Sequence, residues 1–537
     1  MSSSQNDTKR VVQSFWLLGL LNNAPWVLML ACATNISSGG VALVFLANQL
    51  PGLLAKVTAP CWFHKVSYRS RIQIASVSMA LACLLVGLGG LFKDEMSAEE
   101  NNDDSSGGDN ESEQLSEEDT NATNSQSQLG LLLELLGVSF TSFQCSLGEA
   151  SLLALAGKFD SNLIQKQSPS PVPSSIESYS AVDNEGLFSH EEYAENDNTS
   201  TTNDDDASFS SEGILMKSEK QSRKCITAFA SGTGLAGIVG YAYKSLLSEL
   251  FGWGLSYIVW SAVVFAFAYY RIYCVGLHEM EILLEESEQN IQEDERAASL
   301  MAEEEEYIDA TAQRSSLEMV TKPLEEEDVD DSNLLAQYPS ESTTTATTKS
   351  VHQMTGCERF QTVFSLWPYM IPLFFVYMTE YMMQAGIWPA IGFPVTSITA
   401  RGQFYHYANW TYQVGVFLSR SSGNLFTVSL TILWVMPMLQ LVNLCLFWMI
   451  SVHHFWYDYS LLVMCFFVGL LGGGVYVQGY NRINVDMPKE LREFALSSAS
   501  VADSVGILVA DISSLFIQSC IYQRNGIDGA VVSCPLQ

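Results

Sequence analysis

Charged residues are scarce in this sequence. Asp, Glu, Lys and Arg together make up 16% of its 537 residues, whereas a soluble domain carries about a quarter. The charges gather in a few loops dense in Asp, Glu, Ser and Asn, and the long stretches between these loops are almost uncharged. This segregation excludes an ordinary soluble protein and predicts a polytopic membrane protein. It also places the formal net charge of −33 in the loops, so the charge indicates no nucleic-acid partner.

Motifs that carry catalysis or bind metals are absent as well. The sequence has no GxSxG, Walker or HExxH pattern. Its eleven cysteines lack metal-ligand spacing and lie mostly in apolar segments, so they are interpreted as packing residues rather than as a disulfide framework. The adjacent His453 and His454 offer two imidazoles where a metal site needs more ligands. We therefore expect no enzyme, no cofactor and no metal site.

Long apolar runs are what the sequence does contain. A bilayer core of about 30 Å needs about 20 mostly apolar helical residues. The first run starts at Val11 and continues as a full-length span, so we expect a signal anchor rather than a cleaved signal peptide. The predicted fold class is an all-α polytopic membrane protein with about 11 transmembrane helices. The spans are expected near residues 12–34, 40–63, 72–92, 129–157, 225–248, 253–275, 361–388, 408–422, 425–451, 459–482 and 494–520.

Basic residues mark one side of the predicted bundle. When residues 1–10 are placed in the cytosol, most Lys and Arg residues near the spans are cytosolic, and the other side keeps only Lys93, Lys244, Arg401 and Arg524. Because positive charge near spans favours the cytosolic side, we expect a cytosolic N-terminus. The acidic loop 94–128 is then luminal, and Asn110 and Asn121 stand there in glycosylation sequons.

Two further polar segments organise the chain. Residues 159–222 and 277–358 are rich in Ser, Thr, Asp and Glu, so they cannot bury enough apolar surface to offset chain entropy and are predicted to be disordered in the cytosol. The second segment separates an N-terminal six-helix bundle over 11–275 from a C-terminal five-helix bundle over 359–520, which a tail follows over 521–537. Two bundles joined by a central loop are typical of major facilitator transporters.

Two short motifs concern sorting and modification. In the sequence DDSNLL, Asp330 precedes Leu334 and Leu335 with the spacing of an acidic dileucine signal, which clathrin-adaptor-type proteins bind. The last four residues, Cys534-Pro-Leu-Gln, fit a CaaX prenylation box. Prenylation is cytosolic, whereas eleven spans place the C-terminus in the lumen. We expect an unmodified luminal tail, and a prenylated Cys534 is the alternative.

Rare charges inside the spans are the candidates for function. A charge at mid-bilayer costs about 2.5–3.5 kcal/mol on insertion scales, so such side chains usually face a cavity or a partner. Lys56 is interpreted either as a cation for an anionic substrate or as a side chain that snorkels to the cytosolic surface. Glu149 lies deeper in its span. It is interpreted either as a proton-exchanging carboxylate or as a group that joins helices by a hydrogen bond.

The second bundle has an acid in its first span. Glu380 lies in VYMTEYMMQAG, and Tyr377, Tyr381 and Gln384 are expected to share its helix face and to supply hydrogen-bond donors near the carboxylate. A role in proton linkage is the favoured interpretation of Glu380.

Three more charged residues lie near or inside the later spans. Arg420 could hold a phosphate or carboxylate bidentately, although a positive anchor or a gate salt bridge is the preferred interpretation. Asp503 lies about three turns into the last span and is expected to be a polar partner in the bundle, with Asp511 as a weaker candidate.

Blocks in nearly every span resemble the battenin family and occur in its order. They are FWLLGLLNNAPWVLMLACA, LPGLLAKVTAP, YRSRIQIAS, LGEASLLALAGKF, ASGTGLAG, VYMTEYMMQAGIWP, YQVGVFLSRSSGN, GLLGGGVYVQGYNRI and REFALSSASVADSVGI. Several of these blocks contain the rare intramembrane charges, which makes the resemblance specific. The loops 94–128 and 159–222 are longer than the resemblance leads us to expect.

The resemblance implies a multispanning transporter of the lysosomal or vacuolar membrane with a major-facilitator-like fold. The expected partners of the protein are the lipid bilayer, protons and a small anionic metabolite such as a glycerophosphodiester. Export of this metabolite would support lysosomal pH and lipid-catabolite homeostasis. Basic amino acids are the alternative substrate. A non-transporting membrane scaffold in endolysosomal trafficking is the alternative function, and in that case the long cytosolic loops would do the work.

Overall fold

The computed structural model of the chain describes residues 2–36, 41–103, 117–158, 205–279 and 354–535 except 529 and 531, with scattered positions between 281 and 301. All regular elements of this described part are helical. The first half contains α1 (Ser2–Ala31), α2 (Ala33–Ile36), α3 (Val41–Ala47), α4 (Leu50–Trp62), η1 (Phe63–Lys65), α5 (Tyr68–Asp103), α6 (Glu117–Lys158), α8 (Asp205–Phe251), α9 (Leu255–Ser261) and α10 (Val263–Gly276). The second half contains α12 (Gly356–Ser365), α13 (Trp367–Tyr381), η4 (Met382–Ile387), η5 (Trp388–Ala390), α14 (Ile398–Ser421), η6 (Ser422–Asn424), α15 (Leu430–His453), α16 (Leu461–Asp486), α17 (Lys489–Ala499) and α18 (Val501–Arg524).

The described helices confirm an all-α membrane protein. Eight helical stretches are long and apolar enough to cross a membrane, and a pair bent by 62° around Leu366 makes a ninth. These nine coincide with nine of the predicted spans. The two other predictions, 40–63 and 408–422, also coincide with helices, namely α3 with α4 and α14.

Two spans have a different extent from the sequence prediction. The span predicted at 40–63 is broken at Asn48 and Gln49, two residues before Pro51, which has no N–H for a continuous helical ladder. The span predicted to start at 408 starts at Ile398, because the Ser397 side chain accepts a hydrogen bond from the Ala400 N–H and caps the helix. Polar side chains in its first turns had hidden this start from a hydropathy criterion.

Three helices reach into segments predicted as loops. α5 ends at Asp103 and α6 begins at Glu117, both inside the acidic loop 94–128, and α8 begins at Asp205, inside 159–222. Extending an existing helix by one residue costs less free energy than nucleating a new helix, so a helix can continue into a polar segment. A boundary predicted from composition alone is then misplaced. Of the modification and sorting residues, Asn121 falls within α6, whereas Asn110, Asp330, Leu334 and Leu335 lie outside the described residues.

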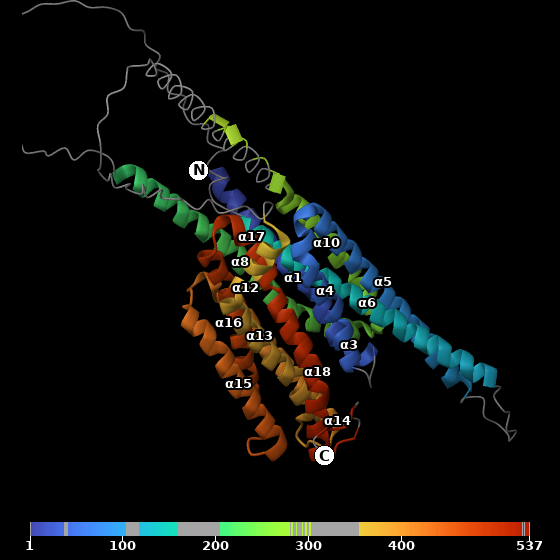
Figure 1. Cartoon of the computed structure of the whole chain (residues 1–537). Helices are drawn as coiled ribbons and strands as arrows, with labels where there is room; N and C mark the ends of the chain where they lie inside the picture. Colours follow the sequence, from blue (N-terminus) through green and yellow to red (C-terminus); the bar gives the residue numbers. More distant parts are fainter. Residues whose placement is uncertain are drawn as a thin grey trace, which may run out of the picture.

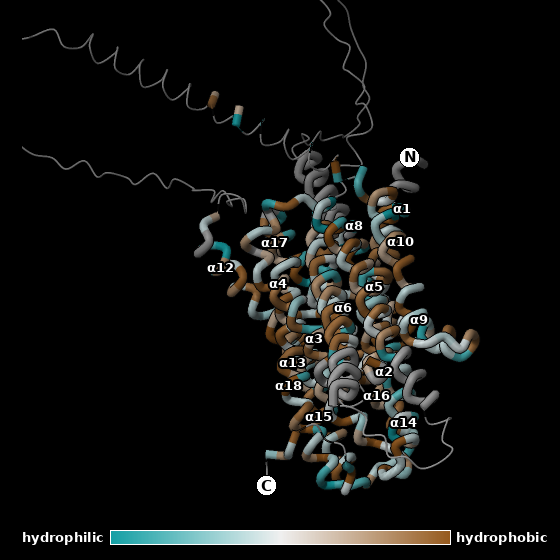
Figure 2. Tube along the Cα trace, turned by 90° about the vertical axis from the view of Figure 1, so that its right-hand side faces the viewer, coloured by the Kyte–Doolittle hydropathy of each residue, from teal (hydrophilic) through white to brown (hydrophobic). Residues whose placement is uncertain are grey.

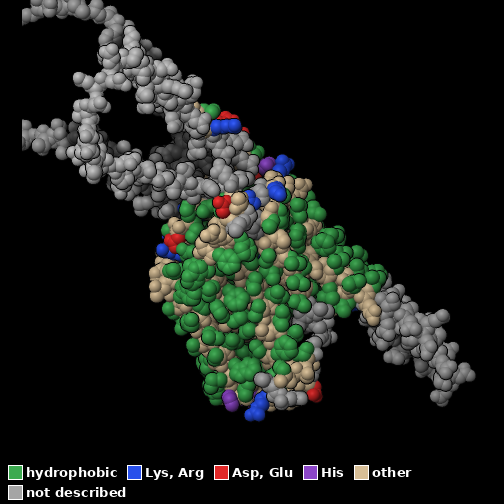
Figure 3. Space-filling model, in the orientation of Figure 1, with side chains coloured by type: hydrophobic (Ala, Val, Ile, Leu, Met, Phe, Trp, Pro, Cys, Tyr) green, Lys and Arg blue, Asp and Glu red, His purple; other side chains and the backbone are tan. Residues whose placement is uncertain are grey.

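The termini lie at opposite ends of the helical body (Figures 1 and 2). We call the end where α1 begins the N face and the end where α18 finishes the C face. Between them the surface is broadly hydrophobic, and most of the visible Lys, Arg, Asp and Glu side chains lie toward the two ends (Figure 3). A chain that starts on one face and ends on the other crosses an odd number of times, a condition that nine and eleven spans both meet.

The two halves share one core near the N face and have separate cores near the C face. The shared core joins first-half residues such as Phe15 and Leu155 to second-half residues such as Tyr480 and Ala495. Toward the C face, one cluster of buried side chains belongs to residues 28–262 and another to residues 383–521. The halves are therefore packed together most extensively at the N face.

Two of the described cysteines form a disulfide. Cys520 of α18 is bonded to Cys534 of the tail. The interpretation of the cysteines as packing residues is therefore wrong for this pair. Sequence spacing had carried no signal for it, because the tail's fold-back depends on the turn after Arg524.

Candidate functional site

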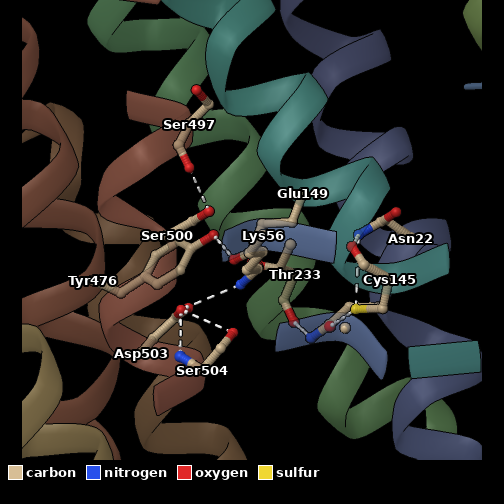
Figure 4. Close-up of polar contacts among 12 residues, drawn as sticks. Asn22, Lys56, Cys145, Glu149, Thr233, Tyr476, Ser497, Ser500, Asp503 and Ser504 are labelled. Atoms are coloured by element: carbon tan, nitrogen blue, oxygen red, sulfur yellow. Dashed lines mark hydrogen bonds and ion pairs between the residues drawn. The ribbon is translucent and has the colours of Figure 1, made fainter. Parts of the chain in front are cut away.

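Lys56 lies at the centre of a cluster of charges between the two halves (Figure 4). Its Nζ atom is 2.6 Å from Glu149 Oε2 and 3.2 Å from Asp503 Oδ1. Lys56 and Glu149 come from α4 and α6 of the first half, whereas Asp503 comes from α18 of the second half. With only 3% of its side chain exposed, Lys56 does not snorkel to the surface. The structure thus brings three of the predicted charges together in one site.

Both carboxylates of this cluster have further donors. The hydroxyl of Tyr476, in α16, donates to Glu149 Oε1 at 2.6 Å, so Glu149 also contacts the second half. Asp503 lies in the first turn of α18, and its Oδ1 accepts the Ser504 N–H at 2.7 Å. The two acids are therefore held by hydrogen bonds as well as by Lys56.

Arg420 forms a second bridge between the halves. Its Nη1 donates to Thr233 Oγ1 of α8 at 2.7 Å, and its Nη2 donates to the Tyr377 hydroxyl of α13 at 2.8 Å. The guanidinium carbon lies 4.2 Å from the centre of the Tyr476 ring, a favourable cation–π distance. The Nε atom is buried and has no partner in the described part of the chain. The partners of Arg420 among the described residues are neutral hydroxyls, so the contacts do not form the salt bridge that the sequence interpretation had named.

Tyr476 connects the two bridges. Its hydroxyl contacts Glu149, and its ring covers Arg420. A neutral tyrosine in an apolar glycine-rich span gave no signal in the sequence, and only the packing of α16 against both halves identifies it. Thr233 was missed for the same reason.

Glu380 lies apart from the Lys56 cluster. It is 1% exposed, and the Tyr412 hydroxyl of α14 donates to one of its oxygens. Its Oε2 atom has no hydrogen-bond partner among the described residues. A Cβ atom at Gly472 of α16 would lie 1.8 Å from Oε2, so only glycine admits the carboxylate there.

The predicted helix-face partners of Glu380 do not supply its hydrogen bond. Tyr377 accepts from Arg420, Tyr381 stacks on Tyr377 with ring centres 6.3 Å apart, and Gln384 Nε2 has no described partner. Gln384 lies in the π-helical turn η4, whose wider winding rotates it away from ordinary i+4 register. The donor is instead Tyr412, which is distant in sequence. Asp511, the weaker candidate, is buried with Oδ1 unpartnered in the described part.

A neutral polar network flanks Glu149 in the first half. Asn22 Oδ1 accepts from Gln144 Nε2 at 3.0 Å and from the Tyr269 hydroxyl at 3.2 Å, and Asn22 Nδ2 donates to the Cys145 carbonyl at 2.9 Å. A Cβ atom at Gly148 would lie 1.9 Å from Asn22 Oδ1, so glycine lets α6 approach this network closely. The network fixes the helix that carries Glu149. No group of three or more His, Cys, Asp or Glu side chains that could hold a metal occurs within the described ranges.

Comparisons with known proteins support the family resemblance. The sequence model of the CLN3 protein family matches residues 13–97 and 207–523. The Neurospora crassa protein btn-1 is 25% identical over 521 residues, covering 94% of this chain and 87% of the relative. The Saccharomyces cerevisiae protein BTN1 is 24% identical over 526 residues, covering 94% and 93%.

Two solved transporter structures are similar at low sequence identity. A D-xylose–proton symporter has a TM-score of 0.40 and 10% identity, covering 95% of this chain and 89% of its own. A bacterial homologue of the human lysosomal transporter Spinster has a TM-score of 0.36 and 11% identity, covering 97% and 85%. The match of the family model to most of the sequence, together with the nearly full-length relatives, shows that this multispanning membrane protein belongs to the CLN3 (battenin) family.

Proposed function

We propose that this protein is a proton-linked carrier that exports small anionic metabolites across a lysosomal or vacuolar membrane. The observation that carries the proposal is the bridge at Lys56, which pairs with Glu149 of its own half and with Asp503 of the other half. Any change in the charge of these three groups changes the contact between the halves. A carrier needs such a link between ligand binding and the movement of its two bundles.

Proton linkage follows from the charge balance of the cluster. Lys56 faces one carboxylate of its own half and one of the other half, so a proton on Asp503 removes the charge that attracts Lys56 across the halves, whereas a proton on Glu149 removes the repulsion between Glu149 and Asp503. With Asp503 neutral, Lys56 stays compensated by Glu149 of its own half, so the halves can separate without leaving a buried charge unpaired. Protonation of Asp503 would in this way favour separation of the bundles.

The two cations provide for an anionic substrate. The planar guanidinium of Arg420 suits a phosphate or carboxylate group, and its Nε atom is not used by the described residues. A phosphodiester would compete with Glu149 and Asp503 for Lys56. The family resemblance suggests glycerophosphodiesters. A basic amino acid is the alternative, with its carboxylate on Arg420 and its cationic end on Glu149.

Orientation and location are part of the proposal. The distribution of Lys and Arg supports a cytosolic N face, and the shared core at this face supports a state closed toward the cytosol. Substrate and protons would then reach the charge cluster from the luminal side. Adaptor binding at Asp330, Leu334 and Leu335 would direct the protein to the lysosome, and glycans on Asn110 and Asn121 would face the lumen.

Reconstitution tests the proposal. Purified protein in proteoliposomes with an acidic interior is loaded with labelled glycerophosphocholine, and efflux is followed together with a pH-sensitive dye. We expect efflux that requires the protein and grows with the pH gradient, and proton movement that occurs only with substrate. Efflux unaffected by the gradient and unchanged in the double variant Glu149→Gln, Glu380→Gln would contradict the proton role.

Separate experiments test the alternative substrate, a basic amino acid, and the alternative function, a membrane scaffold. Labelled lysine replaces the phosphodiester in a parallel set of liposomes, and preferential lysine flux would overturn the anionic substrate class. In cells, deletion of residues 280–350 tests the scaffold. A scaffold requires that this deletion abolish function while charge-neutral core variants retain it.

A further inference from the structure

The tail after α18 folds back and is bonded to the helix. Cys520 and Cys534 form a disulfide, with Cα atoms 4.7 Å apart and a sequence separation of 14 residues. This Cα distance lies in the normal range for a disulfide. The hydroxyl of Ser519 donates to the Val532 carbonyl at 2.6 Å. Two neighbouring residues of α18 therefore hold the tail, one covalently and one by a hydrogen bond.

The base of this loop is anchored in the C face of the second half. Ile521 is fully buried, and the Tyr522 ring lies 5.7 Å from the guanidinium of Arg401 in α14. The Asn525 side chain donates to the Ser451 carbonyl of α15 at 3.0 Å. The loop closed by the disulfide thus joins the ends of three helices at the face opposite the N-terminus (Figure 1). The charge cluster makes no use of it.

We propose that Cys520 and Cys534 form a structural disulfide in the lumen and that the terminal Cys534-Pro-Leu-Gln sequence is not prenylated. Prenylation joins a cysteine sulfur to a lipid through a thioether and requires a free thiol on the cytosolic side. In the disulfide, both sulfur atoms are already bonded to each other. Eight other cysteines of the described part of the chain are free thiols, so the disulfide is specific to the tail.

The oxidation requires a luminal environment. The two thiols lose two protons and two electrons, and a thiol–disulfide oxidoreductase of the secretory pathway accepts the electrons as its own disulfide becomes a dithiol. Such oxidants act in the lumen, whereas cytosolic thiols are kept reduced. The proposal therefore rests on the orientation given under the proposed function, with the N face in the cytosol and the C face in the lumen.

Peptide mapping of the wild-type protein tests the bond. The protein is purified with its free thiols blocked by N-ethylmaleimide, digested without reductant and analysed by mass spectrometry. We expect a cross-linked species containing Cys520 and Cys534 that separates on reduction, and no incorporation of an alkynyl farnesyl probe given to the cells. A C-terminal peptide carrying the probe, or maleimide on both cysteines, would overturn the proposal.

Thiol accessibility tests the side of the membrane. The variant Cys520→Ser leaves the Cys534 thiol free, and sealed vesicles with the cytosolic side outward are treated with a membrane-impermeant PEG-maleimide. We expect labelling of Cys534 only after permeabilisation. The variant Ser67→Cys, at an exposed position of the N face, should be labelled without permeabilisation. The double variant Cys520→Ser, Cys534→Ser gives the background from the remaining thiols.

The outcomes separate this inference from the transport proposal. Labelling of Cys534 in sealed vesicles would overturn the luminal tail. If Cys520→Ser fails to fold, Cys534→Ser tests the same point through the thiol of Cys520, and the wild-type map needs no variant. None of these readouts measures transport, so their failure and a failure of substrate flux are recognised independently.

Discussion

Two acids among the spans, Glu149 and Glu380, have contrasting surroundings. Glu149 is paired with Lys56 and accepts from Tyr476, so its partners come from both halves of the molecule. Glu380 accepts from Tyr412 within its own half, and its second oxygen has no described partner. Protonation of Glu149 would leave Lys56 with Asp503 alone, whereas protonation of Glu380 would leave no cation unpaired. The same residue type can thus couple the halves in one place and hold a proton independently in another.

The largest effect is expected from Lys56→Met. The substitution leaves Glu149 and Asp503 as neighbouring acids without their cation, and removing one partner of a buried pair costs about 3–5 kcal/mol. We expect a lower midpoint of thermal unfolding in detergent and loss of substrate flux. The double variant with Glu149→Gln should recover part of the thermal stability.

A second ion pair provides the control for Lys56. Lys93 pairs with Glu134 inside the first half, between α5 and α6. Lys93→Met should lower the unfolding midpoint and leave the pH dependence of the remaining flux as in wild type. If both lysine variants altered the pH dependence of flux equally, the pH dependence could not be attributed to the Lys56 bridge between the halves.

The next effect concerns the space beside Glu380. In Gly472→Ala the new methyl group would lie 1.8 Å from Glu380 Oε2 and would force the carboxylate off its Tyr412 hydrogen bond. Overpacking of this kind costs about 1–3 kcal/mol. Gly474→Ala is the matched control in the same helix, because its nearest neighbour is Met436 Cε at an ordinary 3.7 Å. Equal unfolding midpoints for the two variants would contradict the close approach.

A smaller effect is expected from Tyr476→Phe. The change removes the hydroxyl that donates to Glu149 and keeps the ring that covers Arg420. The loss of one hydrogen bond typically costs about 0.5–1.5 kcal/mol. We expect a modest decrease in thermal stability and an altered pH profile of flux, whereas Tyr476→Leu should in addition weaken anion binding by disturbing Arg420. Identical profiles for wild type and Tyr476→Phe would show that the hydroxyl does not influence Glu149.

The smallest change in stability is expected from Glu380→Gln. The amide oxygen can still accept from Tyr412, and no cation loses a partner, so we expect a change below about 1 kcal/mol. The coupling of flux to the pH gradient should nevertheless decrease, because an amide does not exchange a proton at this site. A pH profile identical to wild type would assign proton linkage to the Lys56 cluster alone.

Much of the site could be predicted because charge within a membrane span is rare. Lys56, Glu149, Arg420 and Asp503 were each recognisable as costly residues that need a partner. The neutral members could not be recognised in this way. Tyr412, Tyr476 and Thr233 resemble ordinary residues of apolar helices, and their roles depend on helices that pack together from distant parts of the chain.

Register within a helix was a second limit. Regular spacing predicted that Tyr381 and Gln384 would serve Glu380, but the π-helical turn after Tyr381 changes the direction of the following side chains. Nothing in MMQAGI requires that turn. The broken span at α3 and α4 and the polar start of α14 show the same limit for helix boundaries.

The sequence by itself determined that this is a helical membrane protein and where most of its spans lie. It also determined which charged residues are so costly to bury in a membrane that they need a partner. These properties follow from the transfer cost of each residue, which is local. The tertiary structure decided that Lys56 joins two acids that lie 93 and 447 residues away in the sequence, that Glu380 forms no ion pair within the described residues, and that Cys534 meets Cys520. Partner choice depends on which helix faces meet in the folded bundle, and the cost of a buried charge says only that a partner is needed.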